Sequence, residues 1–334
     1  MSSRIVALGG GHGLYTSLTA LRALTEDLTA IVTVADDGGS SGRLRDEMGI
    51  VPPGDLRMAL AALCEDTEWG RTWRDVLQMR FDTQGPLDGH AVGNLLIAAT
   101  WNQTGDIVAG LEWVGRLLRS KGRVLPLASE PLQISALVEN VDGARTVSGQ
   151  VAVATAHGIV KEVRVEPAAP DVPAETLAAI READMIVLGP GSWYTSVLTH
   201  FLVAPVAEAL IEAGPRAVVT LNIAHEDEET AGMERVDDVL ALRRIAPGFV
   251  PAAVLIDESH ANDPELADAI RAWGTTALTA PMLQAGTSDR HDPDVLAGLL
   301  HRARASVAVN GPSVATSGQT HTVRRASGPD TVAG

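Results

Sequence analysis

The sequence is poor in several residue types on which whole classes of protein depend. Cys64 is the only cysteine, which excludes a disulfide framework and a thiolate metal site. Aromatic residues make up 3% of the chain, too few for the stacking platforms of single-stranded nucleic-acid binders. The nine histidines show no HxxxH or HxH spacing, which argues against a zinc site. These absences direct attention to a small-molecule ligand.

Charge and hydropathy restrict the partners further. The formal net charge of −16 repels polyphosphate backbones and anionic membrane surfaces. No apolar run approaches the roughly 20 residues of a membrane span, and the N-terminus lacks the basic and apolar segments of a signal peptide. We therefore expect a cytoplasmic protein without a nucleic-acid or membrane partner. The sequence leaves open whether the chain forms a homo-oligomer and which downstream protein it contacts.

Glycine-rich loops follow three of the predicted strands. Residues 4–8, 31–35 and 185–188 have the apolar pattern of buried strands. The loops after them contain, in order, Gly10, Gly11, His12 and Gly13; Asp36, Asp37, Gly38, Gly39, Ser40 and Ser41; and Gly189, Gly191 and Ser192. Glycines at a strand-to-helix turn let backbone N–H groups approach an anion, and the helix N-terminus adds a favourable dipole. The loops predict a phosphorylated ligand.

The order of the predicted elements indicates an α/β fold. Strands at residues 217–222 and 252–256 continue the alternation of strands and helices, which is typical of a three-layer, Rossmann-like, mainly parallel sheet. Shorter strands at 133–140, 146–154 and 161–166 suggest a small antiparallel excursion in the middle. Asp55 is a plausible N-cap for a helix over 56–64. We expect one domain over residues 1–309, with the excursion over about 133–166, and a mobile Ser/Thr/Gly-rich tail over 310–334.

Other interpretations of these loops stay open. In the dinucleotide fingerprint a third glycine would stand where Leu14 is, so the spacing does not fit an NAD-binding loop. The first loop could also be a tight turn without a ligand. Asp36 and Asp37 could hold Mg²⁺ beside a phosphate and are the candidate catalytic residues. Equally, one of them could cap the following turn while the other bonds a ligand hydroxyl or neighbouring amides.

The motifs together resemble those of the YvcK-type gluconeogenesis factors, relatives of the phospholactate transferase CofD. The resemblance rests on the three loops and on Pro53-Gly54-Asp55-Leu56-Arg57 and Gly93-Asn94. It implies a modified Rossmann-type fold that binds a UDP-sugar, notably UDP-N-acetylglucosamine. It also implies a role in cell-wall morphogenesis and cell shape during gluconeogenic growth, with no settled reaction. The transferase relatives imply the alternative, Mg²⁺-dependent transfer of a phospholactyl group from a guanosine diphosphate donor to a deazaflavin; an NAD-binding protein is the second alternative.

The predicted ligand-binding residues are those that match the motifs. They are Gly10, Gly11, His12, Gly13, Asp36, Asp37, Gly38, Gly39, Ser40, Ser41, Arg43, Asp55, Arg57, Asn94, Gly189, Gly191, Ser192, Tyr194, Thr195, Asn222 and Arg290. Three positions depart from the family pattern. His12 replaces a common threonine, acids at 226–228 stand in a loop that is usually neutral, and Asp257 replaces a common asparagine. The phosphate side of the site is therefore better supported than the nucleoside side.

Overall fold

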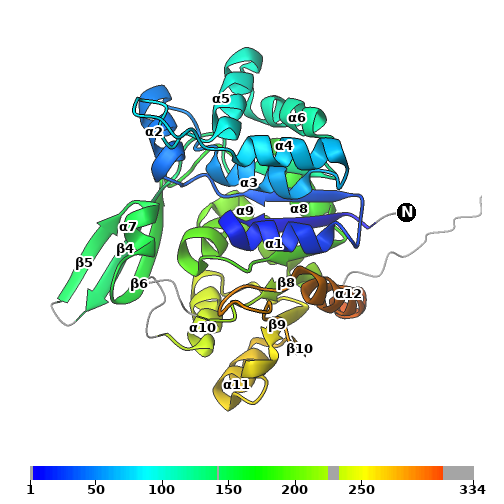
Figure 1. The fold of residues 1–334 in the computed structure, drawn as a ribbon. Helices are drawn as coiled ribbons and strands as arrows, with labels where there is room; N and C mark the ends of the chain where they lie inside the picture. The colour runs from blue at the N-terminus through cyan, green and yellow to red at the C-terminus, as the bar shows by residue number, and fades with distance from the viewer. Residues whose placement is uncertain (1–2, 141–142, 225–232, 311–334) are drawn as a thin grey trace, which may run out of the picture.

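A parallel sheet forms the centre of the molecule. The computed structural model describes residues 3–140, 143–224 and 233–310 (Figure 1). Within these residues seven strands lie in the order β10-β9-β8-β7-β1-β2-β3, and every neighbouring pair is parallel. Their bounds are β1 Ile5–Gly9, β2 Leu28–Val32, β3 Arg123–Pro126, β7 Met185–Leu188, β8 Ala217–Thr220, β9 Ala253–Asp257 and β10 Ala277–Ala280. The prediction of a mainly parallel α/β sheet is confirmed.

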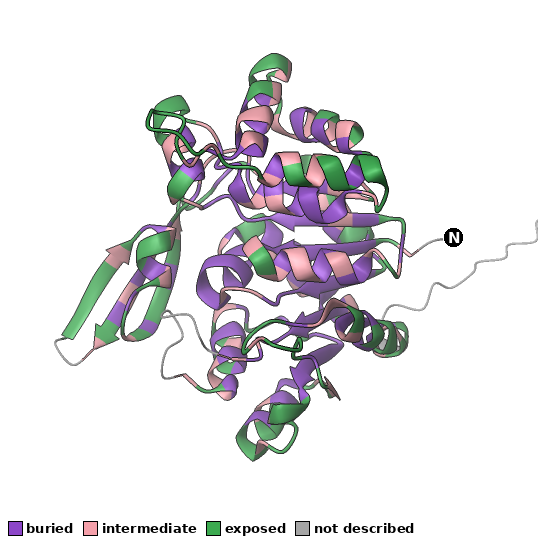
Figure 2. Ribbon diagram, viewed as in Figure 1, coloured by how far each residue is buried: buried purple, intermediate pink, exposed green. Residues whose placement is uncertain are grey.

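Helices cover both faces of this sheet. Strands β1 to β3 advance toward one edge and β7 to β10 toward the other, so right-handed crossovers place their helices on opposite faces. On one face α1 (Gly11–Leu21) packs against α3 (Gly54–Leu63) and α12 (Pro293–Asn310). On the other, α8 (Ala174–Glu182) packs against α9 (Ala204–Ala213), and α10 (Arg235–Ile245) against α11 (Pro264–Trp273). Because both faces are covered, the inner strands β1, β7, β8 and β9 are buried at every position (Figure 2).

The remaining helices extend the α1 side and the end of the sheet. The link between β2 and β3 contains α2 (Gly39–Met48), α4 (Glu68–Gln78), α5 (Val92–Thr104) and α6 (Ile107–Leu118). A π-helical turn, η1 (Trp193–Val197), and a 3₁₀ turn, η2 (Leu198–Leu202), follow β7. No single helix among the described residues is long and apolar enough to span a membrane; the pair Trp193–Leu202 and Ala204–Arg216, bent by 91°, meets that test of length and composition only when taken together.

The predicted antiparallel excursion is a separate three-stranded sheet. Its strands β4 (Gln133–Asn140), β5 (Gly143–Ser148) and β6 (Ile159–Glu166) pair in the order β5-β4-β6. Figure 1 shows it projecting from the central body. The predicted strand over 146–154 is wrong beyond Ser148. Gly149, at φ +105°, turns the chain into the short helix α7 (Gln150–Ala154), which packs on β4.

Two further local predictions need correction. The second strand is Leu28–Val32, not 31–35, because its pairing with β1 ends where Gly9 meets Val32. Asp55 is not the N-cap of its helix; α3 begins at Gly54, and Asp55 lies in its first turn. The predicted tail over 310–334 starts one residue too early, because α12 extends to Asn310; residues 311–334 and the acidic positions at 226–228 lie outside the described residues.

Candidate functional site

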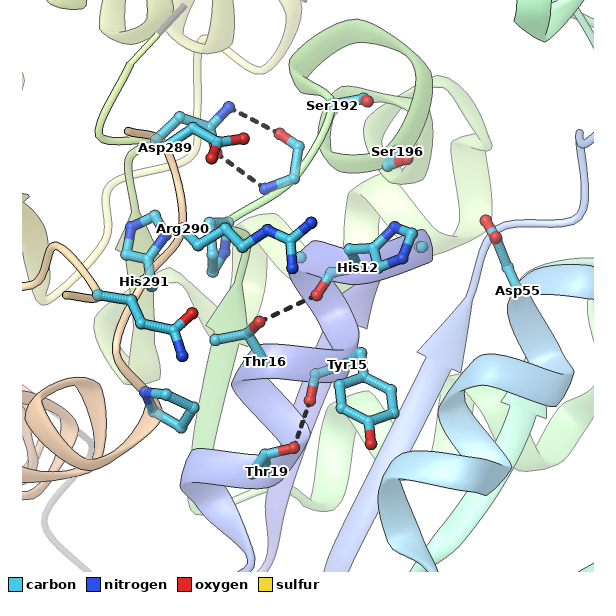
Figure 3. Close-up of a pocket in the computed structure, with 18 of the residues that line it drawn as sticks. His12, Tyr15, Thr16, Thr19, Asp55, Ser192, Ser196, Asp289, Arg290 and His291 are labelled. Carbon is cyan, nitrogen blue, oxygen red and sulfur yellow. Dashed lines mark hydrogen bonds between the residues drawn. The ribbon is translucent and has the colours of Figure 1, made fainter. Parts of the chain in front are cut away.

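A pocket opens at the carboxyl ends of β1, β7 and β8. The chain runs from β1 toward one sheet edge and from β7 toward the other, so β1 and β7 flank the switch point at which open α/β sheets bind ligands. The cavity has a volume of about 550 Å³. It is lined by Gly10, Gly11, His12, Gly13, Tyr15, Thr16, Thr19, Asp55, Gln150, Pro190, Gly191, Ser192, Ser196, Asn222, Ala224, Gln284, Asp289, Arg290, His291 and Pro293 (Figure 3).

The first glycine loop brings the start of α1 to the pocket. Gly10 is the N-cap of α1 and provides no side-chain cap. The Gly11 N–H lies against the Asp55 carboxyl, and the next amides of the helix keep their capacity to bind an anion. Gly11 has φ +54°, which disfavours any residue with a Cβ. Gly13 lies so close to the backbone of Pro190 and Gly191 that a Cβ would overlap it. Glycine here lets two loops meet at one point.

The loop after β7 is fixed by side chains from neighbouring elements. The Gly191 N–H donates to Asn222 Oδ1 and Asn222 Nδ2 donates to the Gly191 carbonyl, both at 2.9 Å. Ser17 Oγ on α1 donates to the Gly189 carbonyl at 2.8 Å. Asn222 follows β8 and Ser17 lies in α1, so elements from both neighbouring strands hold the loop after β7. The pocket wall is therefore set before a ligand arrives.

Asp55 is the titratable group with the most perturbed environment in the pocket. Thr33 Oγ1 donates to Asp55 Oδ2 at 3.4 Å, and a Cβ on Gly10 would lie 2.5 Å from the same oxygen. Burial raises the pKa of Asp55 from 3.8 to about 7, and the negative charge of Asp36 adds to the shift. A carboxyl that titrates near neutral pH can serve as a general acid or base.

Arg290 brings positive charge to the side of the pocket opposite Asp55. It is the only arginine or lysine lining this pocket among the described residues, and Figure 3 shows its side chain extended toward His12. The neighbouring His291 is buried, with Nε2 3.1 Å from the Leu221 carbonyl oxygen. Burial lowers the pKa of His291, so the imidazole is neutral at pH 7 and adds no positive charge to that of Arg290. Asp289 lies on the same side.

A polar network beside the pocket contains several other predicted residues. Ser40 Oγ accepts from the Ala91 N–H at 3.2 Å and from Asn94 Nδ2 at 3.0 Å, and lies 3.1 Å from His90 Nδ1. Arg57 Nε donates to Asn94 Oδ1 at 2.9 Å, while its buried Nη1 has no partner among the described residues. Burial lowers the pKa of Arg57 to about 10, with Arg80 contributing. The network anchors the second loop to α5.

The acidic pair of the second loop binds backbone amides. Asp36 Oδ1 accepts from the Gly38 N–H at 2.9 Å, and Asp37 Oδ1 accepts from the Val151 N–H at 3.0 Å. Among the residues that the structure describes, no group of three or more His, Cys, Asp or Glu side chains is placed to hold a metal. Mg²⁺ binding by Asp36 and Asp37 stays a prediction.

The structure divides the predicted residues into two sets. Those lining the pocket are Gly10, Gly11, His12, Gly13, Asp55, Gly191, Ser192, Asn222 and Arg290. Those outside its lining are Asp36, Asp37, Gly38, Gly39, Ser40, Ser41, Arg43, Arg57, Asn94, Gly189, Tyr194 and Thr195. Tyr194 and Thr195 are buried in η1, and Arg43 Nη2 donates to the Asp88 carbonyl at 2.6 Å. Ligand contact remains a prediction for both sets.

Several lining residues were absent from the sequence-based prediction. Tyr15, Thr16 and Thr19 lie on one face of α1, and their helical spacing from His12 could have indicated this. Ser196 ends the third motif, over 189–196, whereas Gln284 and Asp289 carry no comparable signal. Asp257, which departs from the family pattern, accepts from the Met282 N–H at 2.7 Å. Burial opposes its ionisation, but hydrogen bonds from Ser259 and Met282 hold its pKa below the usual range.

The comparisons with known proteins agree with this fold. The family model for 2-phospho-L-lactate transferase CofD matches residues 5–279. A Mycobacterium tuberculosis protein named "Putative gluconeogenesis factor" is 44% identical over 95% of both chains. The "Gluconeogenesis factor" of Bacillus subtilis is 41% identical over 76% of this chain and 79% of its own.

A solved structure shows the same architecture. The crystal structure of a member of the UPF0052 family from Bacillus halodurans superposes with a TM-score of 0.80 and 32% identity, over 89% of this chain and 98% of that one. An α/β protein with a pocket at the switch point of its sheet is the class that the fold defines. Within that class, the chain belongs to the CofD family, and its sequence relatives are gluconeogenesis factors.

Proposed function

We propose that this protein is a cytoplasmic factor that binds a UDP-sugar, UDP-N-acetylglucosamine in the first instance, and supports cell-wall morphogenesis and cell shape during gluconeogenic growth. The observation that carries the proposal is the pairing of the α1 N-terminus with Arg290 across one cavity. Amide donors in the first turn of α1, at His12 and Gly13, and a guanidinium opposite them suit a diphosphate. The names of the relatives support the gluconeogenic role.

The size and lining of the cavity support a nucleotide sugar as the ligand. A volume of about 550 Å³ lies within the range of typical small-molecule sites. Ser192, Ser196 and Gln150 offer hydroxyl and amide groups that match a sugar. The single arginine suits a diphosphate better than a longer polyphosphate, because each further phosphate adds charge that the acidic chain would repel.

Calorimetry tests the proposal directly. We expect UDP-N-acetylglucosamine to bind the purified protein, and UDP-glucose, UDP, GDP and NAD to rank below it. Chromatography of the mixture after incubation should recover the nucleotide sugar unchanged, as expected of a regulator. Absence of binding by every UDP compound would contradict the proposal, and binding of NAD alone would favour the dinucleotide alternative.

The phospholactate-transferase alternative rests on Asp55. A carboxyl with a pKa of about 7 lines the same cavity, and catalytic acids and bases have such values. Transfer would use Mg²⁺, for which Asp36 and Asp37 are the proposed ligands. The test supplies a phospholactyl-guanosine diphosphate donor, a deazaflavin acceptor and Mg²⁺. We expect no transfer by the wild type. Transfer that Asp36→Asn and Asp37→Asn abolish, with donor binding retained, would establish the enzyme instead.

A further inference from the structure

Gln150 reaches the pocket from outside the central sheet. It is the first residue of α7, in the antiparallel excursion, yet it lines the same cavity as the glycine loop of β1. Its Oε1 is buried and has no hydrogen-bond partner among the described residues. Nearly all buried polar atoms in native proteins have a partner, so an orphan beside a cavity points to a partner supplied by a ligand. The terminal torsion of glutamine is soft, so the oxygen can turn to meet it.

The backbone that carries Gln150 is held on both sides. Asp37 Oδ1 accepts from the Val151 N–H at 3.0 Å, and the Gly149 N–H donates to the Ile134 carbonyl at 2.8 Å. Gly149 has φ +105°, and a Cβ there would overlap the Asp37 carboxylate. The second loop of the central sheet therefore fixes the start of α7. Asp37 is in this sense a positioning residue for Gln150.

The part of the ligand that Gln150 meets follows from its neighbours. Helix α7 packs on η1, which carries Ser196, and Ser196 lies close to Asp55 around Gly10. Figure 3 places Asp55 and Ser196 on one side of the pocket and Arg290, Asp289 and His291 on the other. The Gln150 side thus offers an amide, a hydroxyl and a carboxyl but no cation. Such groups suit hydroxyls and an acetamido N–H rather than phosphates.

We propose that Gln150 is a specificity-determining residue that accepts a hydrogen bond from the sugar of the bound nucleotide, and that Asp37 positions it. The proposal rests on the proposed function, since it assumes a nucleotide sugar in this pocket. It gives the antiparallel excursion a direct part in recognition. The excursion then distinguishes a nucleotide sugar from the bare nucleotide, while the central sheet binds the diphosphate.

Calorimetry with UDP and with UDP-N-acetylglucosamine tests this division. Gln150→Ala should lower the affinity for UDP-N-acetylglucosamine about five- to tenfold, the range of one neutral hydrogen bond, and leave the UDP affinity within twofold. Gln133→Ala is the matched control, because Gln133 is an exposed glutamine of β4 in the same excursion. It should change neither affinity. Equal melting temperatures of the variants will show that the fold is intact.

Asp37 variants test the positioning role. Asp37→Ala removes the acceptor for the Val151 N–H and should lower the affinity for the nucleotide sugar alone. Asp37→Asn keeps an oxygen acceptor and should retain most of the wild-type affinity for the nucleotide sugar. Hydrogen exchange of the α7 amides should quicken in Asp37→Ala and not in Asp37→Asn. If Asp37 had a merely structural role, Asp37→Ala would lower the affinity for UDP as much as the affinity for the nucleotide sugar.

The possible failures are distinguishable. If the wild type binds UDP-N-acetylglucosamine and Gln150→Ala binds it equally well, the Gln150 proposal is wrong and the proposed function stands. If Gln150→Ala weakens UDP and the nucleotide sugar alike, the assignment to the sugar is wrong. If the wild type binds no UDP compound, both proposals fall together.

Discussion

Asn222 and Gly191 bind each other through two hydrogen bonds of 2.9 Å, in which the asparagine amide meets the glycine backbone as a neighbouring strand would. This pairing joins the end of β8 to the glycine loop of β7. Because Gly191 in turn lies against Gly13 of α1, the orientation of the α1 N-terminus depends on a side chain from two strands away. The position of the α1 N-terminus is thus set by the segments that follow three adjacent strands.

Replacing Asn222 should therefore affect both stability and binding. Asn222→Ala leaves the Gly191 N–H and carbonyl without partners, and we expect it to lower the free energy of unfolding by about 1–3 kcal/mol. UDP-N-acetylglucosamine affinity should fall about tenfold or more. Urea denaturation and calorimetry measure the two effects. Asn102→Ala, at an exposed position of α5, is the control and should change neither.

The left-handed conformation of Gly11 gives a second prediction. A side chain at φ +54° costs roughly 1–2 kcal/mol of strain, and relief of that strain would turn the amide away from the pocket. Gly11→Val should reduce nucleotide-sugar affinity at least tenfold while the protein still folds. Gly298→Ala, at an exposed, uncrowded position within α12, should preserve affinity and raise stability by about 0.5–1 kcal/mol. Calorimetry that finds Gly11→Val unchanged would remove this loop from the site.

Three arginines were predicted to bind phosphate, but the structure places only one of them in the pocket lining. We therefore expect their replacements to have different effects on ligand affinity. Arg290 lines the cavity, whereas Arg43 bonds the Asp88 carbonyl and Arg57 bonds Asn94. Arg290→Gln should weaken UDP and UDP-N-acetylglucosamine equally, by about 10- to 100-fold, because a charged hydrogen bond to phosphate is lost. Arg43→Gln should cost less than threefold.

Arg244→Gln is the matched control for these arginine variants. Arg244 is an exposed arginine in the last turn of α10 and does not line the pocket. Its replacement should leave both affinities unchanged. The loss in Arg290→Gln should also shrink at high salt, since ions screen the interaction it removes. An affinity within twofold of the wild type in Arg290→Gln would mean that this arginine has only a surface role.

The sequence predicted the sheet well because strands covered on both faces are continuous apolar runs. Residues 5–9 and 185–188 are buried at every position, and such runs are recognisable without knowledge of their neighbours. The glycine loops that follow these runs are likewise recognisable from local sequence. They predicted where the pocket lies without any knowledge of long-range contacts.

The parts that sequence did not predict depend on distant contacts. The segment 146–154 has a strand-like composition, and the turn into α7 depends on Asp37, whose carboxylate meets Gly149 and Val151. Asp55 matches a helix cap in its local sequence, but its carboxyl faces Gly10 and Thr33, which directly follow β1 and β2. Residue spacing along the chain cannot reveal either pairing.

The raised pKa of Asp55 makes stability depend on pH in a defined direction. The carboxyl has its ordinary pKa of 3.8 when unfolded and a value of about 7 when folded. The folded state therefore binds the proton more tightly, so this stabilising contribution is complete below about pH 4. It is lost as the pH rises toward 7. Asp55→Asn replaces the carboxyl by a neutral isostere and should abolish the loss.

Measured by urea denaturation from pH 4 to pH 8, Asp55→Asn should gain stability relative to the wild type as the pH rises. The gain should reach the order of 2 kcal/mol by pH 8, discounted for the partial exposure of this side chain.

The affinity for a diphosphate should follow the same titration. In the wild type it should fall as the pH passes 7, because ionised Asp55 repels the ligand, and in Asp55→Asn it should stay level. Asp82→Asn, at an exposed site outside the pocket, is the control and should show the wild-type pH profile in both measurements. A flat difference in stability between Asp55→Asn and the wild type over this range would mean that folding does not raise the pKa of Asp55, and would remove it as a neutral group facing the ligand at pH 7.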